Sequence, residues 1–182
     1  MAFTIRFWGV RGTIPCPAAT HLEFGGNTSC VEVVAGDQHI ILDAGTGIRL
    51  LGKRLVADGA THSTLLLSHT HLDHISGFPF FAPAFQRGFA FDIVAGHLGG
   101  SPDLRSVLAR QMERPLFPVP LKTMGCNLEF AEISPGESFS LGASVRVRAA
   151  ALNHPDGATG YRIEYGGRSL VYVTDTEHVA GQ

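Results

Sequence analysis

Residues 69 to 74 read His-Thr-His-Leu-Asp-His and place four potential metal ligands within six positions, directly after the largely apolar run Thr-Leu-Leu-Leu-Ser at 64–68. We expect that apolar run to be a buried strand. Side chains two apart in an extended chain share a face, so His69 and His71 would point the same way and hold one ion. Asp73 and His74 fall where the backbone turns away, and would offer an oxygen and a nitrogen to a second ion. The spacing predicts a two-metal hydrolytic centre at the end of a strand.

The alternative for this segment is an ordinary polar turn, in which Asp73 caps a helix that begins near His74. Three histidines and a carboxylate after an apolar strand have no ordinary packing explanation, because buried polar groups need partners. We therefore favour metal binding.

Two further candidates follow predicted strands later in the chain. His154 comes after a strand expected at 144–152, and Asp175 ends a strand expected at 169–174. Alone, such residues are more often structural, but the upstream cluster reverses that balance. His154 could complete a three-histidine set that leaves the fourth tetrahedral position to water, as catalytic zinc requires. Asp175 could bridge both ions.

Two ions about 3.5–4 Å apart would lower the pKa of a shared water toward roughly 7 and provide a hydroxide nucleophile. Asp73 could orient that hydroxide, so it is a catalytic candidate as well as a ligand. Asp43, in the segment Leu-Asp-Ala-Gly, is expected to accept a hydrogen bond from a ligand histidine or from loop backbone.

Composition restricts the class of protein and its partners. The 182 residues suit a single domain spanning 1–182, and 22 glycines with 10 prolines indicate short strands and many turns. A net charge of -2 gives no basic surface for nucleic acid, so we expect a small-molecule substrate. Cys16, Cys30 and Cys126 form no Cys-x-x-Cys pair, and no secretory or membrane-spanning segment is recognisable. These features predict a cytoplasmic location and no membrane partner.

Hydrophobic periodicity predicts mostly strands with a few interposed helices. A loop and short helix are expected over 75–87, where phenylalanines would wall a pocket. Four other histidines are expected at surface or turn positions: His21, His39, His62 and His97. We expect helices at 48–58 and 103–114, and strands at 3–7, 30–35, 39–43, 64–68, 91–95, 127–133, 145–152, 161–165 and 169–174.

The ordered ligand series from His69 to Asp175 resembles that of the metallo-beta-lactamase fold superfamily. Four segments are similar to a bacterial branch related to cyclic-phosphate phosphodiesterases and ribonuclease Z: Phe-Trp-Gly-Val-Arg-Gly-Thr-Ile-Pro at 7–15, Gly-Gly-Asn-Thr-Ser-Cys at 25–30, Leu-Asp-Ala-Gly-Thr-Gly at 42–47 and Leu-Asn-His-Pro at 152–155. The likeness covers nearly the whole chain. It implies an α+β fold, a four-layer αββα sandwich with metals at one edge between two sheets.

The resemblance also implies a metal set and a substrate. Zinc is the expected cofactor, with two Zn²⁺ ions in an intact enzyme and Mn²⁺ or iron as alternatives. Residues 117–120 would line the entrance for a small phosphodiester, and a homodimer is left open. The implied ligands are His69, His71 and His154 for the first metal, Asp73 and His74 for the second, and Asp175 for both.

The sequence departs from the family after Asp175. Members of the superfamily normally continue with more helices and strands, including a distant histidine ligand for the second metal and a segment that supplies a general acid. Here the only histidine between Asp175 and the last residue of the sequence, Gln182, is His178. We expect a fold truncated at the C-terminus, or one completed by another chain, with a weaker second site and low activity. His178 is a candidate for substrate contact and hence a second catalytic candidate.

Three function classes follow. The leading one is a metal-dependent hydrolase of a phosphodiester, including cyclic ones, that uses metal-activated hydroxide. The second keeps the fold but cleaves a carbonyl ester, thioester or lactone; the absence of a cysteine at position 175 disfavours a beta-lactam substrate. The third is an inactive metal-binding module that has lost its last ligand, and iron redox chemistry is a more remote alternative.

Overall fold

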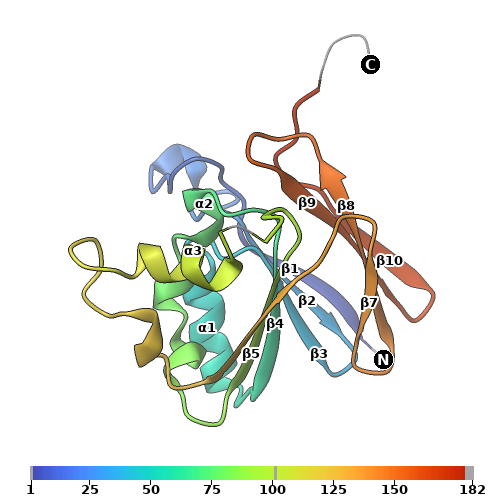
Figure 1. Cartoon of the computed structure of the whole chain (residues 1–182), viewed down its shortest axis with the longest axis horizontal. Coiled ribbons are helices and arrows are strands. Elements are labelled where there is room, and N and C mark those ends of the chain that lie inside the picture. The colour runs from blue at the N-terminus through green and yellow to red at the C-terminus, as the bar shows by residue number, and fades with distance from the viewer. Residues whose placement is uncertain (1, 101, 179–182) are drawn as a thin grey trace.

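The computed structural model describes residues 2–100 and 102–178, in which two β-sheets pack face to face and helices cover the outer side of the first sheet (Figure 1). The first sheet has six strands in sequential order: β1 (Phe3–Gly9), β2 (Cys30–Ala35), β3 (Gln38–Leu42), β4 (His62–Leu67), β5 (Ala90–Ala95) and β6 (Asn127–Glu132). Strands β1 to β3 pair antiparallel, whereas β3 to β6 run parallel. The carboxyl ends of β3 to β6 therefore meet at one edge of the sheet.

The second sheet has four antiparallel strands in the order β10-β9-β8-β7. They are β7 (Ser138–Leu141), β8 (Val145–Leu152), β9 (Ala158–Tyr165) and β10 (Arg168–Tyr172). Strand β8 shows the alternation of a half-buried strand, because Val145, Val147 and Ala149 are buried while the residues between them are exposed.

Helices connect the parallel strands, as a parallel pairing requires. Helix α1 (Ile48–Ala57) buries Ile48, Leu51 and Leu55, which lie on one face at helical spacing. Helix α2 (Leu72–Ile75) is one turn long and contains the second half of the histidine motif. The other helices within residues 2–100 and 102–178 are α3 (Leu104–Gln111) and four short 3₁₀ segments, η1 (Ala19–His21), η2 (Phe78–Phe80), η3 (Ala82–Phe85) and η4 (Leu121–Thr123).

Two apolar cores hold these layers together. One lies between the sheets and includes Val33, Leu66 and Ile163; the other lies between the first sheet and the helices and includes Leu65 and Phe81. Strand β4 contributes to both, since successive side chains point to opposite faces. Its continuous apolar run is the pattern of a strand buried on both sides.

The α+β sandwich predicted from the sequence is confirmed. Three of the four predicted layers lie within residues 2–100 and 102–178, where no helix covers the outer face of the second sheet (Figure 1). The expectations missed β7, a four-residue edge strand with only Phe139 and Leu141 facing inward. The last strand ends at Tyr172 rather than at 174. Within the same ranges, no helix has the length and apolar character needed to cross a membrane.

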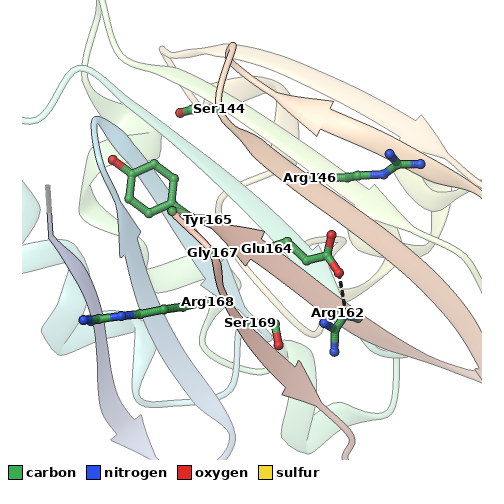
Figure 2. A pocket seen from close by; sticks show the side chains of 9 residues that line it. Ser144, Arg146, Arg162, Glu164, Tyr165, Gly167, Arg168 and Ser169 are labelled. Carbon is green, nitrogen blue, oxygen red and sulfur yellow. Dashed lines mark hydrogen bonds and ion pairs between the residues drawn. The ribbon is translucent and has the colours of Figure 1, made fainter.

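The outer face of the second sheet carries exposed arginines. Arg146 lies opposite Glu164 across β8 and β9, and Arg162 forms an ion pair with Glu164, as Figure 2 shows. These residues border a hollow of about 380 Å³ near the turn between β9 and β10. His154 and Asp175 follow the other ends of β8 and β10, so this hollow lies at the opposite end of the sheet from the predicted ligands.

A buried tyrosine of the second sheet binds the strand that leads into the histidine motif. The Tyr161 hydroxyl donates a hydrogen bond of 2.7 Å to the Leu67 carbonyl oxygen. Burial raises the pKa of Tyr161, so the hydroxyl stays protonated and donates at any physiological pH. Tyr165, four residues on, is also buried, but its hydroxyl has no hydrogen-bond partner within the described residues.

We predict that Tyr161→Phe lowers the free energy of unfolding by about 1–2 kcal/mol, because it leaves a buried carbonyl without its donor. Tyr165→Phe is the matched control and should change that free energy by about 0 kcal/mol, since it removes an unpaired hydroxyl. Urea denaturation of both variants measures the difference. Equal losses in the two variants would contradict the proposed role of the Tyr161 hydrogen bond.

Candidate metal centre

The predicted ligands converge at the edge of the first sheet where the parallel strands end. Residues 69–74 follow β4 there, and His154 and Asp175 reach the same place from the ends of β8 and β10. Two groups of ligand atoms result, His69 with His71 and His154, and His69 with His74 and Asp175. Within each group the atoms lie within 4.8 Å of one another.

The carboxylate of Asp175 lies between the two groups. Its Oδ2 atom is 3.9 Å from His69 Nε2, 3.7 Å from His74 Nε2 and 3.8 Å from His154 Nε2. His154 Nε2 in turn lies 3.2 Å from His71 Nδ1. This is where a carboxylate that bridges two ions would be placed.

The Nε2 atoms of His69 and His74 are buried. The side chains of His69 and His74 are 1% and 3% exposed, and neither Nε2 atom has a hydrogen-bond partner within the described residues. Buried polar atoms are nearly always satisfied, so each such atom needs an explanation. Donors about 2 Å from a common zinc ion lie roughly 3–4 Å apart, which agrees with the distances to Asp175. These residues therefore fit a bound divalent cation.

Electrostatics keep His69 in the form that binds metal. Burial, with a further contribution from the neighbouring charge of His74, lowers the pKa of His69 to about 3. The imidazole is then neutral at physiological pH, and metal ligation requires the neutral form.

The fully buried carboxylate of Asp43 holds the ligand His74 by the ring nitrogen that does not face the other ligands. It accepts hydrogen bonds from the Ser68 amide at 2.7 Å, the Ser68 hydroxyl at 2.8 Å and the Tyr172 hydroxyl at 2.8 Å. His74 Nδ1 lies 2.7 Å from the same carboxylate, as predicted for a residue that supports a ligand. Burial lowers the pKa of His74, but the hydrogen bond and charge of Asp43 outweigh it and the pKa is raised. Because Nδ1 is engaged by Asp43, only Nε2 of His74 faces the other ligands.

The predicted ligand Asp73 lies beside His74 but is not a member of either group of ligand atoms. Its Oδ2 atom accepts a hydrogen bond of 2.7 Å from the Thr13 amide and lies 3.5 Å from His74 Nε2. The N-terminal loop thus fixes the carboxylate beside the histidines. A cavity of about 190 Å³ adjoins this point and is bordered by Arg11, His74 and Asp175. Arg11 itself donates to the Gly25 carbonyl oxygen at 2.9 Å, so it binds backbone rather than a carboxylate.

Glycine is required at position 45 for the loop to pass under the ligands. A Cβ atom there would lie 2.5 Å from Thr28 Oγ1 and 2.6 Å from the Ser29 carbonyl oxygen. The loop can approach this closely only without a side chain. Gly45 is therefore a packing requirement of the site.

Two other histidines, His178 and His97, lie outside the two ligand groups. His178 is exposed and has no hydrogen bond or ion pair to the cluster within the described ranges, so its catalytic role stays a prediction. His97 lies in the bend after β5, in agreement with the expected turn position, but it is not fully exposed. It is half-buried, its Nε2 lies 3.0 Å from Thr70 Oγ1, and burial lowers its pKa to about 4. It follows β5, the parallel neighbour of β4, and residues after adjacent parallel strands meet at the same edge.

We predict that Asp43→Asn weakens zinc binding by about 10- to 100-fold, because the imidazole of His74 loses its charged hydrogen-bond partner. Asp37→Asn, in an exposed turn, is the control and should bind zinc as the parent chain does. Competition with a chromophoric chelator measures both affinities. An unchanged affinity in Asp43→Asn would contradict this role.

His154→Ala and His178→Ala provide a second comparison. Removing a ligand should abolish tight zinc binding at the first group, whereas removing the exposed His178 should leave the zinc affinity unchanged. Isothermal titration with zinc distinguishes the variants. Tight binding retained in His154→Ala, or lost in His178→Ala, would show that the ligand set is misassigned.

The chain is 29% identical over 161 residues to ribonuclease Z of Bradyrhizobium sp. strain ORS 278, an alignment that covers 85% of this chain and 47% of that protein. The chain thus spans about half the length of the curated relatives it matches.

Solved structures share the fold at low identity. The metallo-beta-lactamase fold protein YhfI from Bacillus subtilis superposes with a TM-score of 0.70 at 17% identity, over 99% of this chain and 65% of that one. Zn²⁺-bound PqqB from Methylobacterium extorquens gives a TM-score of 0.60 at 15% identity, over 97% and 67%.

The family model described as the beta-lactamase superfamily domain matches residues 38–182. That range begins with β3 and contains every predicted ligand. The chain therefore belongs to the metallo-beta-lactamase superfamily, in which it is similar to ribonuclease Z.

Proposed function

We propose that this chain carries the metal site of a hydrolase that cleaves phosphodiesters, with cyclic diesters among the possible substrates. The observation that carries the proposal is the position of Asp175, whose Oδ2 atom lies within 4 Å of histidine nitrogens from both ligand groups. Such an arrangement suits two neighbouring cations, a common device for in-line displacement at phosphorus. The similarity to a protein named ribonuclease Z supports phosphorus as the electrophile.

Zinc is the cation that we propose, with manganese or iron as alternatives. His69, His71 and His154 would hold one ion, His74 and Asp73 the other, and Asp175 both. Bound there, zinc would polarise a phosphoryl oxygen and lower the pKa of a water at the site.

The chain's own residues would position the substrate and the proton acceptor. Asp73 is held by the Thr13 amide, so its carboxylate is fixed beside the second group and can accept a proton from a water there. Asp43 keeps His74 oriented and leaves its Nε2 atom free for the cation. The neutral His69 keeps the lone pair of its Nε2 atom available to a cation, which a protonated imidazole could not offer.

The test is hydrolysis by the zinc-loaded chain of bis(4-nitrophenyl) phosphate, a chromogenic lactam and a thioester. We expect turnover of the phosphodiester above that of the other two. In Asp175→Ala the rate should fall by more than the roughly 10- to 100-fold typical of residues that only support ligands. Preference for the lactam or thioester would contradict the proposal. So would tight zinc binding without hydrolysis of any of the three, which would indicate a metal-binding module.

A further inference from the structure

Two of the candidate ligands have neighbouring polar groups that orient their rings. His69 Nδ1 lies 3.1 Å from Ser68 Oγ, and His74 Nδ1 lies 2.7 Å from Asp43 Oδ2. Such partners fix the direction of a ligand ring, and losing one typically weakens metal binding by about 10- to 100-fold. The ligands of a functional site must be held to within about half an ångström. A comparable support is therefore required for His71, the third histidine of the motif.

The ring of His71 has no hydrogen bond to a supporting group of this kind within the described residues. Its Nδ1 atom lies 3.2 Å from Nε2 of the candidate ligand His154, and its Nε2 atom lies 3.8 Å from Asp156 Oδ2. The side chain of Asp156 is 93% exposed, and an exposed ion pair contributes little. The direction of the His71 ring is therefore set mainly through its own backbone.

The neighbouring residue Thr70 anchors this backbone from the opposite side. His69 and His71 face His154, whereas Thr70 between them lines an apolar cavity of about 490 Å³ beside α2 and α3. Thr70 Oγ1 lies 3.0 Å from His97 Nε2, in a partly buried hydrogen bond. Nδ1 of His97 is buried and has no partner in the described part of the chain. The bond to Thr70 is thus the one side-chain hydrogen bond that the His97 ring makes there.

Strand pairing brings His97 to this position. Strands β4 and β5 run parallel and stay paired to their carboxyl ends, so the segments that follow them leave the sheet side by side. A Cβ atom at Gly157 would lie 3.4 Å from the His97 carbonyl oxygen, which places that glycine against His97. The Gly157 amide donates to the His154 carbonyl oxygen at 3.0 Å. His97 therefore adjoins both segments that carry the outer ligands, His71 and His154.

We propose that His97 is a positioning residue of the metal centre, which holds Thr70 and thereby aims His71 at the cation; this inference rests on the proposed function, for which the metal site is required. His97 belongs to neither ligand group, and its Nε2 atom is engaged by Thr70. Without that hydrogen bond the backbone between the first two histidines of the motif could rotate. Zinc binding at the three-histidine group would then weaken.

The test measures the zinc affinity of His97→Leu, of Thr70→Val and of the double variant by competition with a chromophoric chelator. Either single change removes the hydrogen bond and should weaken zinc binding by about 10-fold, the lower end of the range for groups that support ligands. The double variant should bind zinc as tightly as each single variant, since both changes remove the same interaction. Losses that multiply to about 100-fold would show independent sites and overturn the proposal.

Two further variants separate positioning from a general effect on stability. His97→Gln places an amide near the former position of Nε2 and should restore most of the zinc affinity. His62→Leu is the matched control, because His62 Nε2 lies 2.9 Å from Asp92 Oδ2 at the start of β4, away from the ligands. This control should leave the zinc affinity unchanged.

The visible absorption bands of the cobalt-loaded chain report the geometry of the ligands. They should change in His97→Leu and stay as in the parent chain in His97→Gln and His62→Leu. A residue that only stabilises the fold would alter the free energy of unfolding and leave these bands unmoved. Unchanged bands and zinc affinity in His97→Leu, or no recovery in His97→Gln, would overturn the proposal.

The parent chain and His154→Ala separate failure of this proposal from failure of the proposed function. Tight zinc binding that is lost in His154→Ala but kept in His97→Leu would reject the role of His97 and leave the metal site standing. A parent chain that binds no zinc tightly would reject both. Coupled losses in the His97 and Thr70 variants without hydrolysis of a phosphodiester would reject the proposed function and leave the positioning role standing.

Discussion

The carboxylate of Asp43 connects the parts of the molecule that must meet for a metal site to exist. It is fully buried and bonds to Ser68 after β4, to His74 in α2 and to Tyr172 in the second sheet. A buried charge is costly unless every lone pair finds a donor, so these contacts must form together. The backbone at Asp43 has a positive φ of 61°, a conformation that aspartate tolerates better than most residues. One side chain thus ties both sheets to the histidine loop.

The sequence was sufficient to predict the local part of the site. The motif at 69–74 follows an apolar strand, and both strand and ligand spacing are properties of a few consecutive residues. His154 and Asp175 were also predictable, because each follows a strand end. The convergence of these three segments needed the resemblance to a known family as well, since spacing alone does not say which strand ends meet.

Contacts between distant segments were beyond prediction from local pattern. In the sequence Tyr172 has the pattern of an ordinary strand residue. Its hydroxyl nevertheless donates a hydrogen bond to Asp43, which lies 129 positions earlier in the sequence. His97 shares an edge with the ligands only because β5 pairs with β4. An apolar cavity beside the ligands is lined by residues from 70–80 and from 107–117, and only the packing of α3 beside α2 brings these segments together. The four-residue strand β7 is too short for its alternation to stand out. The cytoplasmic location, the homodimer and the single-domain organisation stay predictions.

The central claim is that imidazoles and carboxylates from both sheets enclose a divalent cation. Diffraction at the zinc absorption edge from crystals of the zinc-loaded chain tests it most directly, because anomalous density locates the ion without reference to any assumed ligand. We predict an anomalous peak about 2 Å from nitrogen atoms of His69, His71 and His154, with Asp175 next to it. A peak elsewhere on the chain, or none near these residues at saturating zinc, would show that these residues do not form the metal site.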